Sequence, residues 1–110
     1  MPIIHEISNL YKELYNTRNQ ISKLDKLSIY LKIENIIIEC LELGIASALS
    51  PKNIKIDLVY KLKIKIEVAK RLIRLIWELK IITNKKYITL EEKVVKISKM
   101  ASGWIKYLNK

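Results

Sequence analysis

Hydrophobic residues recur at helical spacing in four segments of the chain, and short polar stretches separate these segments. The segments that we expect to be helices are residues 3–21, 26–48, 51–80 and 85–109. Apolar positions in steps of three and four residues place one stripe of side chains on one side of a helix. Long helices joined by short turns predict an all-α fold, specifically an up-and-down antiparallel four-helix bundle.

The stretch KLKIKIEVAK at residues 61–70 alternates lysine with aliphatic residues and by itself is typical of a half-buried strand. The alternation ends at Val68 and Ala69, whereas helical spacing continues to the end of the segment. The apolar series in this third helix is Val59, Leu62, Ile66, Ala69, Ile73 and Ile76. The fourth helix has the matching series Leu90, Val94, Ile97, Ala101, Trp104 and Leu108. We therefore predict a helix through residues 61–70.

The first two helices have less regular apolar series. The first is Ile3, Ile7, Leu10, Leu14 and Ile21, broken by Thr17. The second is Leu27, Leu31, Ile38, Leu41, Ile45 and Ala48, interrupted by Glu34, and Ile33, Ile36 and Ile37 widen it. A carboxylate among apolar residues needs a partner, so we expect Glu34 to meet a lysine, an arginine or a backbone donor.

Residues that favour helix ends lie between the segments. Asp25 is a candidate N-cap for the second helix, and Ser50 with Pro51 can begin the third. The fourth helix has two possible starts. Thr83 and Asn84 can cap it near Lys85, or the residues from Thr89 to Glu92 can form a capping box near Leu90.

Length and composition agree with a single domain over residues 1–110. Half of the residues are hydrophobic, and the two glycines and two prolines are too few for the tight turns of an all-β fold. Cys40 is the only cysteine, so we expect a buried thiol in a reducing compartment, without a disulfide or zinc site. The chain has neither a signal-peptide pattern nor about 18 successive uncharged apolar residues, which predicts a cytoplasmic location and no membrane partner.

The positive charge is concentrated in the C-terminal half of the chain. The net charge is +10, with −1 on residues 1–50 and +11 on residues 51–110. This asymmetry indicates a polyanion or an acidic protein surface as partner, or otherwise a solvated lysine face. On a helical wheel, Lys63, Lys70 and Arg74 form one ridge of the third helix, with Arg71 beside it. The further candidates for nucleic-acid binding are Lys80, Lys85, Lys86, Lys93, Lys96 and Lys99.

The third helix also has more apolar surface than one bundle needs. Its apolar positions cover roughly 220° of the circumference, and a stripe of ~100° or somewhat more is enough in a monomeric bundle. We expect either contact with another subunit or a wide core. No nucleophile or metal-binding pattern has an orienting partner, which argues against an enzyme and against a cofactor.

Several short motifs are distributed along the last three helices: Lys32-Ile33-Glu34-Asn35, Lys65-Ile66-Glu67, Leu72-Ile73-Arg74-Leu75, Glu78-Leu79, Tyr87, Ile97, Met100 and Ser102-Gly103-Trp104-Ile105-Lys106. They resemble the accessory variability determinants of diversity-generating retroelements, which belong with the S23-type proteins of ribosomal-RNA intervening sequences. The last motif is the most specific, although Ser102 stands where a glycine pair before the tryptophan is common. The alanine-rich second helix of the general S23 type is absent, which favours the accessory-determinant branch.

The resemblance implies a homopentameric barrel of bundles with a basic outer surface. It also implies binding to a reverse transcriptase and to its template-repeat RNA, or to DNA, in support of mutagenic cDNA synthesis. The alternative is an S23-type oligomeric scaffold whose basic face binds an acidic protein or ribosomal RNA. A third possibility is a binder of anionic membrane surfaces, which is weaker because the bundle should already bury the apolar helix faces.

Overall fold

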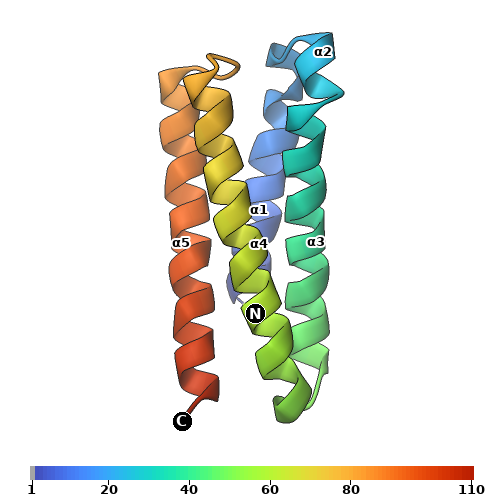
Figure 1. The fold of residues 1–110 in the computed structure, drawn as a ribbon, viewed down its shortest axis with the longest axis vertical. Helices are drawn as coiled ribbons and strands as arrows, with labels where there is room; N and C mark the ends of the chain where they lie inside the picture. The colour runs from blue at the N-terminus through green and yellow to red at the C-terminus, as the bar shows by residue number, and fades with distance from the viewer. Residues whose placement is uncertain (1) are drawn as a thin grey trace.

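The computed structural model describes residues 2–110, and Figure 1 shows their arrangement. The helices are α1 (Pro2–Thr17), α2 (Lys23–Lys26), α3 (Ile29–Leu49), α4 (Lys52–Glu78) and α5 (Asn84–Leu108), with one 3-10 turn, η1 (Arg18–Gln20), between α1 and α2. The four long helices are packed in the order α1, α3, α4, α5, and α5 also contacts α1. The expected four-helix bundle is therefore confirmed.

Successive long helices run in opposite directions along a body that measures 44 × 21 × 18 Å. The α2 segment and the α4–α5 turn lie at one end, and the α3–α4 turn and the C-terminus lie at the other (Figure 1). Each long helix therefore has one side toward the core, two sides toward neighbours and one outer side. The excess positive charge of the sequence belongs to α4, α5 and the turn between them.

The core stripes of three helices match the sequence pattern. Every predicted apolar position of α1 and α4 is buried, as is Ile21 beyond α1. In α5 the predicted stripe is buried except for Trp104, which is half-buried against the core. In α1 and α5 the other sides are mostly polar, so one stripe faces the core, whereas α4 also has exposed apolar residues outside its core stripe.

The predicted stripe of α3 is wrong in part, because Leu31, Leu41 and Ala48 are only half-buried, whereas Ile33, Ile36 and Ile37, which were expected to widen it, belong to the core. The structure buries Tyr30, Ile33, Ile36, Ile37, Cys40, Gly44 and Ser47, whereas Leu27, Ile38 and Ile45 are exposed. Apolar residues surround most of α3, so helical spacing alone allows more than one stripe. The buried stripe includes Gly44, which lies against Ile4 and Ile7 of α1, where an added Cβ would make an ordinary contact at 3.5 Å from Ile4 Cγ1.

The helix ends near α2 differ from the expected positions. Helix α1 ends at Thr17, whose buried Oγ1 donates a hydrogen bond to Glu13 O. Asp25 is not the N-cap of the long second helix, because it lies inside α2, where Ser22 Oγ accepts a hydrogen bond from its backbone nitrogen. Helix α3 begins after Ser28, three residues later than predicted.

The structure also shows which residues begin α4 and α5. Pro51 precedes α4 as its N-cap residue, and Ser50 Oγ donates to Ala46 O instead of capping α4. Thr83 caps α5, because its Oγ1 accepts from the Lys86 backbone nitrogen. The alternative start at Thr89 is wrong, since Thr89 lies inside α5.

Candidate nucleic-acid interface

Helices α4 and α5 pack side by side along most of their lengths and are joined by a short turn, so their basic residues belong to adjoining surfaces (Figure 1). At the turn, the backbone of Lys80 has a φ of 61°. Lys80 N donates to Trp77 O, and Ile81 N donates to Ile76 O. This pattern ends a helix with a left-handed residue, a position that usually holds glycine.

Lys63, the first residue of the predicted ridge, is held between α4 and α5. Its Nζ donates to the carbonyl oxygen of Ser98 at 3.2 Å and to Ser98 Oγ, and lies 3.4 Å from Glu67 Oε2. Ser98 Oγ in turn donates to Glu67 Oε2. The hydrogen bond from Ser98, with the nearby Lys63, lowers the pKa of the Glu67 carboxyl. Lys63 therefore links α4 to α5, and its ammonium group is poorly placed to contact a ligand.

Three other predicted residues also lie beside carboxylates. Arg74 Nε is 3.8 Å from Glu78 Oε2 on the same helix, and both side chains are exposed. Lys86 Nζ is 3.0 Å from Glu13 Oε1, and Lys96 Nζ is 3.2 Å from Glu6 Oε1. Both glutamates belong to α1, so Lys86 and Lys96 lie on the side of α5 that faces α1.

The remaining candidates have no ion-pair partner among residues 2–110. They are Lys70, Arg71, Lys80, Lys85, Lys93 and Lys99. Arg71 is central on the outer side of α4, where it lines two neighbouring hollows of about 420 and 450 Å³. Lys93 follows Lys86 by seven residues and so lies on its side of α5, away from Arg71. The structure thus divides the ten candidates between at least two faces.

An aromatic cluster beside the α4–α5 turn was not among the predicted site residues. The rings of Trp77 and Tyr87 stack with centroids 4.4 Å apart, and the Arg74 guanidinium lies 6.0 Å from the Trp77 ring centroid. Trp77 Nε1 also donates to Asn84 Oδ1 at 2.7 Å. Burial raises the pKa of the Tyr87 hydroxyl. These contacts fix the turn and hold Arg74 at the edge of the basic surface.

The outer side of α4 carries an apolar stripe that no other part of residues 2–110 covers. Ile64 is 63% exposed, and Val68, Leu75 and Leu79 are also exposed. These residues follow one another in steps of four and seven along α4, about opposite to the core stripe. Exposed apolar side chains are ordinary when isolated, but a continuous stripe indicates an interaction surface.

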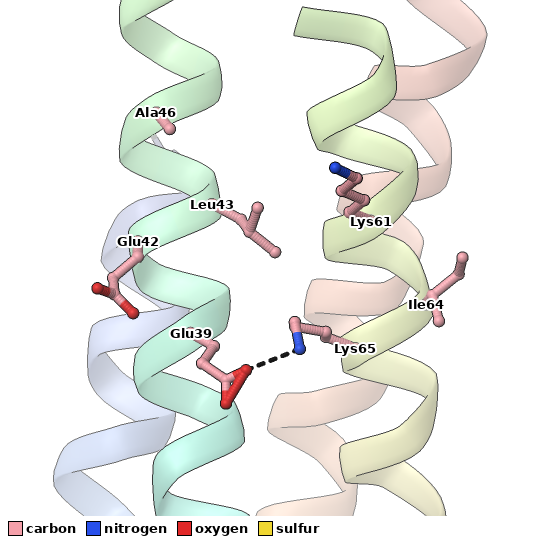
Figure 2. A pocket seen from close by; sticks show the side chains of 7 residues that line it. All are labelled: Glu39, Glu42, Leu43, Ala46, Lys61, Ile64 and Lys65. Atoms are coloured by element: carbon pink, nitrogen blue, oxygen red, sulfur yellow. Dashed lines mark hydrogen bonds and ion pairs between the residues drawn. The ribbon is translucent and has the colours of Figure 1, made fainter.

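A groove between α3 and α4 adjoins this stripe at Ile64. Its volume is about 510 Å³, and its lining residues are Glu39, Glu42, Leu43, Ala46, Lys61, Ile64 and Lys65. Figure 2 shows Leu43 between the two helices, with the carboxylates on the α3 side and the lysines on the α4 side. Lys65 Nζ donates to Glu39 Oε2 at 2.7 Å, and this bond lowers the pKa of Glu39 and raises that of Lys65 (Figure 2).

Buried ionisable groups lie inside the bundle, away from the basic surface. Glu34 meets Arg18 as expected, with Arg18 Nε 3.1 Å from Glu34 Oε2, and burial raises the pKa of the Glu34 carboxyl. The Tyr30 hydroxyl donates to Leu14 O, and burial raises its pKa. Cys40 is fully buried, as predicted, and burial raises the pKa of its thiol to about 12.

Neither metal-binding clusters nor membrane-spanning helices occur in the part of the chain that the structure describes. Within residues 2–110, no three histidine, cysteine or acidic side chains are grouped as metal ligands. Over the same residues, each helix is too short or too polar to cross a bilayer.

No protein-family model matches this chain, and a search of curated proteins gives no match either. The side chains and their geometry therefore carry the functional argument.

Proposed function

We propose that this protein is a non-enzymatic, oligomeric accessory factor of a diversity-generating retroelement. In this role it binds the reverse transcriptase and its template-repeat RNA, and supports mutagenic cDNA synthesis. The resemblance of the helix motifs suggests the role. The observation that carries it is the group of six basic side chains on α4, α5 and their turn that lack an ion-pair partner among residues 2–110.

Unpaired basic residues on rigid helices suit the phosphate backbone of RNA. Each lysine or arginine that neutralises a phosphate releases condensed counterions, so affinity falls steeply as salt rises. Arg71 and Lys99 are good candidates for such contacts, because both are exposed and neither has an ion-pair partner among residues 2–110. Lys63 is a poorer candidate than the sequence pattern suggests, since binding phosphate would break its bonds to Ser98 and Glu67.

The expected partner of the apolar stripe is a second copy of this chain. The groove beside the stripe has carboxylates on its α3 rim and lysines on its α4 rim (Figure 2). Lys65 and Glu39 pair within one chain, so Lys61 of one copy can pair with Glu42 of the next. Contact between two different patches is head-to-tail, and such contacts close into a ring when the rotation between copies allows it. A ring of five is the state that the resemblance suggests.

Binding to single-stranded RNA across a salt series tests the electrostatic contact. We expect affinity to fall steeply between about 50 and about 200 mM salt, and Arg71→Gln or Lys99→Gln to lower the slope of log K by ~0.7 each. Lys32→Gln, an exposed change on α3, is the matched control and should leave the slope unchanged. A flat salt dependence, or no binding at low salt, would contradict the proposal.

Light scattering tests the assembly. We expect a mass of five times the 12.9 kDa of one chain, and a monomer for Ile64→Glu. Ile88→Glu is the control, because Ile88 is similarly exposed but lies on α5. A monomeric wild type, or an Ile64→Glu variant of unchanged mass, would rule out this interface.

The reverse transcriptase partner is tested by co-purification. A reverse transcriptase encoded beside this gene, together with a repeat pair, should co-purify with the tagged protein after nuclease treatment. Failure to recover the enzyme from an intact retroelement would contradict the accessory role and favour a scaffold for another partner.

A further inference from the structure

Two adjoining hollows on α1, η1 and the end of α2 are lined by residue types that suit unpaired nucleotides. The larger, of about 400 Å³, is lined by Tyr11, Lys12, Tyr15 and Asn16. The smaller, of about 150 Å³, is lined by Tyr15, Arg18, Asn19 and Lys26. Since Tyr15 lines both hollows, the two hollows meet at the Tyr15 side chain and form one continuous surface.

The tyrosine rings give this surface a platform for stacking. Tyr15 is 56% exposed, and its ring stacks on that of Tyr11 with centroids 6.4 Å apart and an angle of 30° between the planes. Tyr11 packs against the core, so it supports Tyr15 from the protein side. Nucleic-acid bases stack on such rings whatever their identity, because every base has a π-face.

The polar residues around the rings match the other parts of a nucleotide. Lys12 and Lys26 have no ion-pair partner within residues 2–110 and can contact phosphate. The Arg18 side chain is 34% exposed and is oriented by Glu34. Asn16 and Asn19 are exposed, and their amides can both donate to and accept from base edges.

We infer that the Tyr11–Tyr15 surface binds unpaired nucleotides of single-stranded RNA, with a base stacked on Tyr15 and phosphates near Lys12 and Lys26. This inference rests on the proposed RNA-binding function and adds a contact to bases, which the basic residues of α4 and α5 do not supply. An acidic peptide would use the lysines but would gain little from the paired rings and amides.

Binding of a short oligouridylate and of an abasic oligomer with the same number of phosphates tests the inference. Tyr15→Ala should weaken oligouridylate binding by about 5- to 150-fold, the range for loss of one stacked base. The loss should be the same at every salt concentration, because the ring is neutral and releases no counterions. Tyr15→Phe should retain the affinity, and binding of the abasic oligomer should not change in either variant.

Tyr107→Ala is the matched control, because Tyr107 is 66% exposed but lies near the end of α5. Unchanged oligouridylate binding in Tyr15→Ala, or equal loss in Tyr107→Ala, would overturn the inference. So would wild-type affinity for the abasic oligomer equal to that for oligouridylate. In each of these cases a steep salt dependence would still support the α4–α5 surface, whereas absence of any binding by the wild type would overturn both proposals.

Discussion

Lys80 occupies a backbone position at the end of α4 that suits glycine better than lysine. Its φ is 61°, in the left-handed region where a Cβ costs about 1–2 kcal/mol. The hydrogen bonds from Lys80 N and Ile81 N require this conformation, since they satisfy carbonyl groups in the last turn of the helix. The lysine side chain therefore has a cost in stability, and its unpaired ammonium lies on the proposed RNA-binding surface.

Replacing Lys80 by glycine should stabilise the bundle and weaken RNA binding at the same time. We expect Lys80→Gly to raise the free energy of unfolding by about 0.5–1 kcal/mol, because relief of strain exceeds the added flexibility of glycine. Urea denaturation measures the change. Lys80→Ala is the control, because it removes the same charge but retains the Cβ. A gain of equal size in Lys80→Ala would show that backbone strain is not the cause.

Glu34 is a buried carboxylate whose partner, Arg18, is only partly buried. Burial raises the pKa of Glu34 in the folded state above its unfolded value. The folded protein therefore binds this proton more tightly, and the contribution of Glu34 to stability falls as pH rises through the interval between the two pKa values. At neutral pH the ionised carboxylate is the less favourable form for the fold.

The uncharged variant Glu34→Gln should accordingly be at least as stable as the wild type at neutral pH. The difference should disappear as pH falls below the usual range of glutamate pKa values, where the wild-type side chain is also neutral. Denaturation at several pH values measures this. Glu34→Ala should instead lose about 1–3 kcal/mol in acid, because it leaves a cavity, and less at neutral pH, where the wild type carries the ionised carboxylate. A Gln variant that is much less stable at neutral pH would show that the ion pair outweighs burial.

At the scale of helices, the difference in polarity between the sides of a helix decided whether the sequence could predict its buried stripe. In α1 and α5 the largely polar other sides left one core stripe, and it is the observed one apart from the half-buried Trp104; in α4 the unbroken apolar series identified the core stripe although apolar residues also lie outside it. In α3, apolar residues on several sides allow more than one stripe, and the packing of α3 against α1 and α4 decides which one is buried. Caps were ambiguous for a similar reason, since Ser22, Asp25 and Ser28 are all good N-cap residues within one short stretch.

The basic residues could be identified from the sequence, but their partners could not. Helical spacing predicts on which side of a helix a lysine lies. It does not predict which side chains of the neighbouring helix lie beside that lysine. Lys86 and Lys96 meet glutamates that are 73 and 90 residues away in the chain. The hollows around Tyr15 were missed because their residues come from two helices and a turn in the half of the chain without excess positive charge.

The contact between α4 and α5 through Ser98 gives a prediction at this scale. Ser98→Ala removes the donor to Glu67 and an acceptor of Lys63, so we expect a loss of about 1 kcal/mol in stability at neutral pH. The pKa of Glu67 is lowered in the folded state, so its contribution is present above the unfolded pKa and is lost as pH falls through the folded one. The cost of Ser98→Ala should therefore shrink in acid. Ser102→Ala, one turn further and exposed, should cost little.

At the scale of the whole molecule, the net charge and the exposed apolar surface have opposite effects on assembly of the chains. Each chain carries a net charge of +10, and the proposed ring brings five such chains together. Self-repulsion of this size opposes assembly, whereas burial of the α4 stripe favours it. RNA on the basic surface would neutralise the ring, so RNA binding and assembly should support each other.

Salt should therefore act on assembly and on RNA binding in opposite directions. Raising salt from about 50 to about 200 mM screens the repulsion between chains, because the Debye length falls toward about 8 Å, so the ring should become more stable. The same change releases RNA. Light scattering with and without oligouridylate measures both: at low salt, RNA should increase the assembled fraction, and at higher salt the protein should assemble alone. Ile64→Glu should stay monomeric throughout. If the wild type dissociates as salt rises, ion pairs across the groove rims hold the copies together, and the apolar stripe does not.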